Sequence, residues 1–99
     1  MVSPTKEDRF ALGAQVMTCG VASRIEEDPA FATFAQESMA RHARGDWGDL
    51  CKEDKNANNL SLKDGDRLLS AYEHPTLPKI WIITECDRSA TTILFPDEY

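Results

Sequence analysis

The alternation of apolar and polar residues divides the chain into a largely helical first half and a β-rich second half. Residues 80–84 (IWIIT) and 91–95 (TTILF) are apolar runs rich in β-favouring residues, and they flank a polar stretch at residues 85–89. This arrangement predicts a β-hairpin. Because residues 80–83 are apolar on both faces, we expect the hairpin to form the middle of a sheet.

A third strand is predicted just before the hairpin. Leu68, Ser70 and Tyr72 point one way and Leu69 and Ala71 the other, which is the period of two of a β-strand. Two prolines in the following loop interrupt the strand, since proline has no backbone donor for a sheet. The second half of the chain therefore predicts an antiparallel meander of three strands.

The first half contains one strong helix signal. Asp28 is a favoured N-cap and Pro29 a favoured first helical residue, and the helix is expected to run to Ala43, before Gly45. One face of this helix carries the positions Phe31, Phe34, Ala35, Ser38, Met39 and His42. A weaker helix is predicted over residues 51–63, with an Asp cap at position 49 and Gly65 at its end.

The N-terminal segment gives weaker signals. Residues 10–18 are ambiguous between strand and helix and favour a strand, and residues 21–27 predict a short helix capped by Thr18 or Ser23. Residues 1–8 are polar and expected to be disordered. The whole chain therefore predicts a single α+β domain, with an N-terminal strand and helices packed on the meander in a sheet of three to four strands.

The charge is unevenly distributed along the 99 residues. The net charge is −6, and residues 46–99, with six basic and eleven acidic groups, carry −5 of it. Such a surface repels phosphate backbones, so no direct binding of duplex DNA is expected. A protein partner with a basic surface is favoured instead.

The cysteines and histidines do not indicate a metal site. Cys19, Cys51 and Cys86 are odd in number and far apart, and only His42 and His74 could assist them. No metal or cofactor is therefore expected, and the thiols predict buried free cysteines in a reducing compartment. No apolar stretch approaches about 18 residues, so we expect a soluble cytoplasmic protein without a membrane segment.

One group of polar residues could carry catalysis. His42 could act as a general acid or base, or it could lie on the apolar helix face and bond a backbone carbonyl. Arg67, Glu85 and Arg88 are the groups that a phosphodiester would need, although any exposed hairpin displays such groups. No phosphate-binding loop, nucleophile elbow or zinc-protease motif is present. Whether the protein is an enzyme stays open, and a non-catalytic role is favoured.

A second group could form an interaction surface. Acidic residues around two turns could supply electrostatic complementarity, and exposed aromatic residues could supply anchors. This predicted surface consists of Asp46, Trp47, Asp49, Tyr72, Glu85, Asp87, Arg88 and Tyr99. For Trp47 the alternative is a packing role, and for Asp46 and Asp49 it is the capping of turns.

Several segments carry a resemblance to a known family. They are residues 41–48 (RHARGDWG), 56–59 (NANN), 67–72 (RLLSAY), 80–85 (IWIITE), 87–89 (DRS), 91–94 (TTIL) and 96–99 (PDEY). These segments resemble a family of small "plasmid-related" proteins of bacterial mobile elements. The family has no established activity, so the resemblance implies no catalytic residues. The expected architecture is also similar to that of the barnase/RelE-like small ribonucleases, in which only His42, Arg67 and Arg88 match in kind.

Three functions follow as expectations. The favoured one is a small acidic interaction protein of a mobile element that inhibits a host defence complex, of anti-restriction or anti-CRISPR type, by occupying a basic surface. The alternatives are a ribonuclease or toxin that uses His42 and Arg88, and a small regulatory domain that forms a homodimer through a sheet edge.

Overall fold

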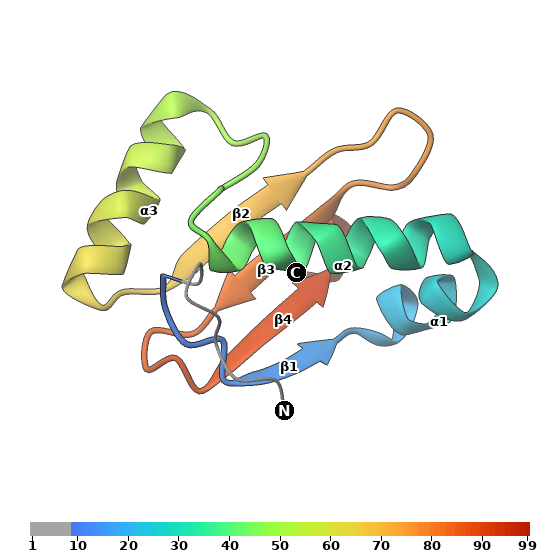
Figure 1. Ribbon diagram of the computed structural model, residues 1–99, viewed down its shortest axis with the longest axis horizontal. Coiled ribbons are helices and arrows are strands. Elements are labelled where there is room, and N and C mark those ends of the chain that lie inside the picture. The colour runs from blue at the N-terminus through green and yellow to red at the C-terminus, as the bar shows by residue number, and fades with distance from the viewer. Residues whose placement is uncertain (1–8) are drawn as a thin grey trace.

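The computed structural model of the protein describes residues 9–99 and has an α+β fold, as predicted (Figure 1). The prediction that residues 1–8 are disordered lies outside the described residues. The elements in chain order are β1 (Ala14–Met17), α1 (Cys19–Glu27), α2 (Pro29–Ala43), α3 (Lys52–Asp64), β2 (Leu68–Tyr72), β3 (Ile80–Thr84), β4 (Ala90–Leu94) and a 3-10 turn, η1 (Pro96–Glu98).

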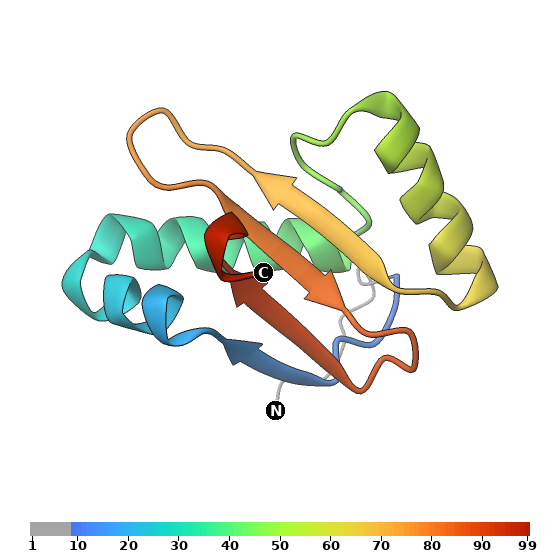
Figure 2. The same cartoon turned by 180° about the vertical axis from the view of Figure 1, so that it is seen from behind.

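The sheet has four strands in the order β1-β4-β3-β2. The three C-terminal strands pair antiparallel, which confirms the predicted meander, and β1 pairs parallel with β4. The predicted hairpin β3–β4 therefore lies in the middle of the sheet. Helix α2 crosses one face of the sheet, and η1 lies on the opposite face (Figure 2).

The predicted capping of α2 is confirmed. The carboxylate of Asp28 accepts hydrogen bonds from the amides of Ala30 and Phe31 at 3.1 and 3.2 Å, and Pro29 is the first helical residue. These contacts satisfy two amides that have no partner within the helix. Gly45 then turns the chain with φ +80°, a conformation that favours glycine.

The N-caps of α1 and α3 decide between two predicted caps in the first helix and correct the predicted cap in the second. Thr18 rather than Ser23 caps α1, accepting from the amide of Val21 at 3.4 Å. Cys51 occupies the N-cap of α3 and makes no side-chain hydrogen bond there, so the predicted cap at Asp49 is wrong. The carboxylate of Asp49 instead accepts a hydrogen bond from the amide of Glu73 at 2.8 Å.

The core lies between α2, α1 and the sheet. The apolar face of α2 that the sequence predicts packs against alternate residues of the central strands, because residues two apart in a strand share a face. The buried cluster consists of Val21, Phe31, Phe34, Ala35, Met39, Tyr72, Ile80, Ile82 and Ile93.

The opposite face of the sheet is covered in part by the C-terminal residues. The rings of Trp81 and Tyr99 meet edge to face with their centroids 5.7 Å apart. The guanidinium of Arg67 lies 5.3 Å from the centre of the Tyr99 ring and donates a hydrogen bond to its hydroxyl at 2.8 Å. Arg67 is therefore held against the C-terminus.

The cysteines differ from the sequence prediction. All three are free, as expected, but they are exposed rather than buried, because they lie at the ends of α1 and α3 and in the β3–β4 turn. Within residues 9–99, no helix has the length and apolar character needed to cross a membrane.

Candidate functional site

His42 lies in a buried chain of hydrogen bonds that joins α2 to three strands. Its side chain has no exposed surface. Nδ1 lies 2.5 Å from the hydroxyl of Ser70 on β2, and Nε2 lies 2.8 Å from the hydroxyl of Thr84 on β3. The Thr84 hydroxyl is 2.8 Å from that of Thr91 on β4, which donates to the carbonyl of Leu12 at 2.7 Å.

The last acceptor in this series of hydrogen bonds determines which atom donates in each of them. A backbone carbonyl can only accept, so the Thr91 hydroxyl donates its one proton to the carbonyl of Leu12. The Thr91 oxygen must therefore accept the hydrogen bond from Thr84. Thr84 must then accept from Nε2–H of His42, which leaves Nδ1 to accept from Ser70. The chain therefore requires a neutral imidazole with its proton on Nε2.

The electrostatics agree with this assignment. Burial in the core, and secondarily the positive charge of Arg88, lowers the pKa of His42 to about 3. The ring is neutral at pH 7 and has no exposed atom with which to contact a substrate. The expected bond to a backbone carbonyl was wrong, because the ring bonds two strand hydroxyls, and the geometry gives His42 a structural role.

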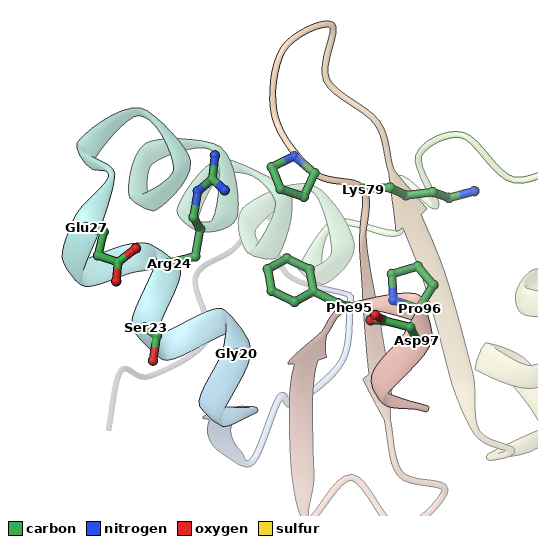
Figure 3. Close-up of a pocket in the computed structure, with 9 residues that line it drawn as sticks. Gly20, Ser23, Arg24, Glu27, Lys79, Phe95, Pro96 and Asp97 are labelled. Atoms are coloured by element: carbon green, nitrogen blue, oxygen red, sulfur yellow. The ribbon is translucent and has the colours of Figure 1, made fainter.

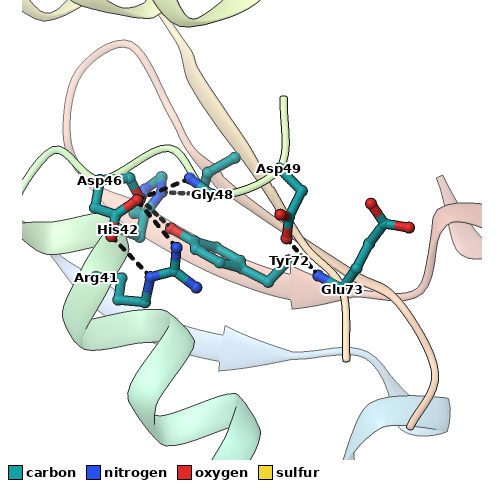
Figure 4. Close-up of polar contacts among 8 residues, drawn as sticks. Arg41, His42, Asp46, Gly48, Asp49, Tyr72 and Glu73 are labelled. Carbon is teal, nitrogen blue, oxygen red and sulfur yellow. Dashed lines mark hydrogen bonds and ion pairs between the residues drawn. The ribbon is translucent and has the colours of Figure 1, made fainter. Parts of the chain in front are cut away.

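The turn that follows α2 is held by a second set of polar contacts (Figure 4). The carboxylate of Asp46 forms an ion pair with Arg41 at 2.8 Å and accepts from the amide of Gly48 at 3.1 Å. The hydroxyl of Tyr72 donates to the backbone carbonyl of Asp46 at 2.7 Å. Asp46 is therefore a turn residue with its charge paired, and these contacts lower its pKa.

The two aromatic residues of this region are not available as binding anchors. Trp47 is 3% exposed and Tyr72 is fully buried, so the prediction that they form part of an interaction surface was wrong. Gly48, with φ +74°, brings the turn so close to β2 that a Cβ there would lie 2.0 Å from the carbonyl oxygen of Ala71. Trp47 lies in this turn, and its side chain is part of the core. Tyr99, the third aromatic residue of the predicted surface, is 66% exposed.

The same turn and helix α3 cover the outer edge of β2. The side-chain amide of Asn58 bonds both the amide and the carbonyl of Leu69, as a neighbouring strand would. The amide of Ala71 donates to the carbonyl of Trp47 at 3.3 Å, and its carbonyl accepts from Asp49 at 2.7 Å. The backbone groups at this edge are therefore satisfied within the molecule.

Arg88 organises the β3–β4 turn with a half-buried side chain whose guanidinium bonds backbone carbonyls. It has φ +60°, and its guanidinium donates to the carbonyls of Asp66, Glu85 and Ser61 at 2.7, 3.2 and 3.4 Å. Its guanidinium also lies 5.7 Å from the centre of the Phe10 ring. Arg88 therefore holds the α3–β2 connection against the β3–β4 turn.

This contact gathers exposed carboxylates at one end of the molecule. Asp64 ends α3, Asp66 lies in the connection, and Glu85 and Asp87 lie in the turn. We call these four residues the acidic end. The ion pairs found among residues 9–99 involve Asp28 and Asp46, and none of the acidic end. The exposure of Glu85 and Asp87 agrees with their expected place on the surface.

The residues of the ribonuclease alternative do not form one exposed site. His42 is buried, Arg67 is held by Tyr99, and the guanidinium of Arg88 is directed to backbone carbonyls. Only Glu85 among them presents an exposed side chain without such a contact in the described part of the chain. Of the four residues, Glu85 and Arg88 lie together in the β3–β4 turn, where Arg88 donates to the Glu85 carbonyl at 3.2 Å.

A groove of about 570 Å³ lies between α1 and the segment after β4 (Figure 3). Phe95, Pro96 and Pro78 supply apolar surface, and charged side chains of both signs surround them. One of these, Arg24, is paired with Asp28 at 3.2 Å. The mixed charge favours no single class of ligand. No group of His, Cys, Asp and Glu side chains within residues 9–99 is suited to hold a metal ion.

The sequence did not indicate the structural roles of several buried polar residues. Ser70, Thr84 and Thr91 are fully buried and complete the His42 chain, and Asn58 covers the edge of β2. Their signal is a polar residue at a core-facing position of an apolar strand. The period of two already placed Ser70 beside Leu68 and Tyr72.

Comparison of the chain with protein-family models, curated proteins and solved structures finds no match. The resemblance to plasmid-related proteins and to small ribonucleases therefore stays a prediction.

Proposed function

We propose that the protein is a small interaction protein that binds a basic surface of a partner protein through its acidic end. The observation that carries the proposal is the concentration of Asp64, Asp66, Glu85 and Asp87 at one end of the molecule without ion-pair partners among the described residues. Electrostatic complementarity of this kind accelerates association and selects the partner.

The neighbouring cations form no ion pairs with the acidic end among residues 9–99. The same region also contains Lys63 in the last turn of α3, Arg67 in the connection and Arg88 in the β3–β4 turn. Arg88 donates to three backbone carbonyls and Arg67 to the Tyr99 hydroxyl, and among residues 9–99 neither forms an ion pair with the four carboxylates. The four carboxylates and the three cations together leave a local net charge of −1, and the carboxylates are exposed without ion pairs among the described residues.

The acidic end is also held in place before binding. Arg88 bonds carbonyls of both segments. The side chain of Ser89, and secondarily its amide at 3.0 Å, bond the carboxylate of Asp87 and lower its pKa. A surface that is ordered in the free protein loses less conformational entropy on binding. This supports a role in recognition.

The chemistry favours a partner that normally binds nucleic acid. Closely spaced carboxylates present the same sign of charge as phosphates, so they suit the basic channel of a nuclease or effector complex. The resemblance to proteins of mobile elements supports a host defence complex, of restriction or CRISPR type, as this partner.

The proposal is tested by reversing charges in two matched sets. The first variant carries Asp64→Lys, Asp66→Lys and Glu85→Lys, and the second carries Glu26→Lys, Glu27→Lys and Glu37→Lys, which are exposed on α1 and α2. Both variants change the net charge from −6 to 0. We expect wild type and the second variant to bind and inhibit a purified restriction or CRISPR complex, and the first variant to fail.

The matched net charge separates a local surface from a general effect of charge. If both variants lose binding equally, long-range attraction rather than the acidic end is responsible. If the first variant retains full binding and inhibition, the acidic end is not the interaction surface.

A further inference from the structure

The sheet has one edge that no described residue covers, and it belongs to β1. The amide of Ala14 donates to the carbonyl of Ser89, just before β4, at 3.0 Å, and the amide of Thr18 donates to that of Ile93 in β4 at 3.1 Å. Because backbone groups point to opposite sides at alternate residues, those of Gln15 and Met17 point away from the sheet. The side chains of β1 are exposed along its whole length.

This edge is short, with four residues, and it lacks the charged residues, prolines and bulges that often protect an edge strand. Its sequence is Ala-Gln-Val-Met. Val16 and Met17 are 45% and 46% exposed, and they are two of the four large apolar residues that are exposed in the described part of the chain. The edge of β2, in contrast, is covered by Asn58 and the Trp47–Asp49 turn.

The surface beside the edge is neutral. A groove of about 220 Å³ lies between β1 and α2, lined by Gln15, Val16, Met17, Ile25, Ala32, Ala35, Gln36, Met39 and Ile93. None of the lining residues is charged, although 28% of the chain is charged and the net charge is −6. Two copies of such an acidic protein repel each other least where they meet through neutral faces.

We propose that this face is a homodimer interface, in which β1 pairs antiparallel with β1 of a second copy around a two-fold axis at Val16. The proposal goes beyond the partner-binding function and uses a different surface. Gln15 would face Met17 of the second copy, and the outward amides and carbonyls of both residues bond no other residue among residues 9–99. Each such pair exchanges two hydrogen bonds, so symmetry gives four bonds across the axis.

The side chains are compatible with this register. Met17 shares a face with Ile93 of the core, so Val16 lies on the opposite face and meets Val16 of the second copy as an apolar pair. Met17 of one copy lies beside Gln15 of the other at the mouth of the neutral groove, which its flexible side chain can enter. The two sheets then form one continuous sheet of eight strands.

The test is the oligomeric state of the whole chain by sedimentation velocity, from about 1 to 500 µM protein. We expect a concentration-dependent dimer for wild type and a monomer for Val16→Glu, because two like charges would face each other across the axis. The matched control is Leu60→Glu, which changes an apolar residue that is 62% exposed on α3 and should still dimerise. Circular dichroism verifies that each variant is folded.

Cross-linking tests the register independently. In a Cys19→Ser, Cys51→Ser, Cys86→Ser background, Val16→Cys should form a disulfide-linked dimer, because opposed residues of a non-hydrogen-bonded pair lie about 4.5 Å apart at Cα. Leu60→Cys in the same background should not. A wild-type monomer over the whole concentration range overturns the proposal. So does a dimer that survives Val16→Glu and does not cross-link through Val16→Cys.

Discussion

At the scale of single residues, His42 illustrates how a candidate catalytic group can be a structural one. Its two ring nitrogens bond Ser70 and Thr84, and the bond from Thr91 to a backbone carbonyl sets the direction of the chain. A buried polar group without a partner costs about 1–3 kcal/mol. The ring therefore stabilises the fold by satisfying hydroxyls on two strands at once.

Replacing His42 with alanine should lower the free energy of unfolding by about 3 kcal/mol, since Ser70 and Thr84 would lose their partner and a cavity would form. Urea denaturation measures the change. The matched control is His74→Ala in the exposed β2–β3 loop, which should cost less than about 1 kcal/mol. Equal costs for the two variants would contradict the structural role of His42.

The lowered pKa of His42 also predicts how the free energy of unfolding depends on pH. The pKa of His42 is about 3 in the folded protein, against 6.5 for an ordinary histidine, so between these values the unfolded chain binds more protons. The free energy of unfolding should therefore fall as the pH is lowered through this window, by up to about 1.4 kcal/mol per pH unit, and stay level above pH 7. Urea denaturation between pH 4.5 and 7.5 tests this above the main carboxylate range.

His42→Gln removes the titrating group and should flatten this dependence, whereas His74→Ala should keep it. An unchanged slope in His42→Gln would show that another group is responsible. The lowered pKa values of Asp28, Asp46 and Glu98 act at lower pH, because carboxylates with lowered pKa values lose their contribution only as they become protonated.

At the scale of elements, the sheet is asymmetric in the protection of its edges. Asn58 provides β2 with an amide that imitates a neighbouring strand, and β1 has no such cover among the described residues. Exposed strand edges are sites of association, so this difference directs any pairing of sheets to β1.

Asn58→Ala should destabilise the protein by about 1–3 kcal/mol, because the amide and carbonyl of Leu69 would lose their partner. Asn56 is exposed on α3, and its replacement by alanine gains the same helix propensity without removing a contact to β2, so the difference between the two variants isolates the edge contact. Thermal unfolding of both variants measures it. Equal melting temperatures would contradict the role of Asn58.

The sequence predicts most elements because their signals are local. The Asp28-Pro29 start of α2 and the alternation in residues 68–72 depend only on neighbouring residues, and both are confirmed. The parallel pairing of β1 with β4 joins residues 76 positions apart, as in Ala14 and Ala90, and no local pattern determines such a pairing.

The candidate site is less predictable for the same reason. Glu85 and Asp87 follow from their place in a hairpin turn, and they are exposed. The burial of Trp47 depends on the contact of Gly48 with β2, and the direction of Arg88 depends on carbonyls more than 20 positions away. When the burial or the hydrogen bonds of a side chain depend on backbone groups far away in the sequence, local sequence does not determine its role.

At the scale of the whole molecule, the proposed binding of a partner and the proposed dimer formation use different surfaces. The acidic end lies at the β3–β4 turn and the start of β2, while α1 lies at the other end of the long axis (Figure 1). The neutral β1 edge lies along the side of the sheet. A protein with this arrangement can pair through β1 and still present its acidic end to a basic partner.

The most direct test of the proposed function is the affinity of one inhibited defence complex for three proteins, measured by calorimetric titration at about 0.1 M salt. These are wild type, the variant with Asp64, Asp66 and Glu85 changed to Lys, and the control with Glu26, Glu27 and Glu37 changed to Lys. We predict that the first variant binds about 100-fold more weakly, since each reversed charge costs on the order of 1 kcal/mol, and that the control stays within about threefold of wild type. Equal affinity of the first variant and wild type would contradict the proposal.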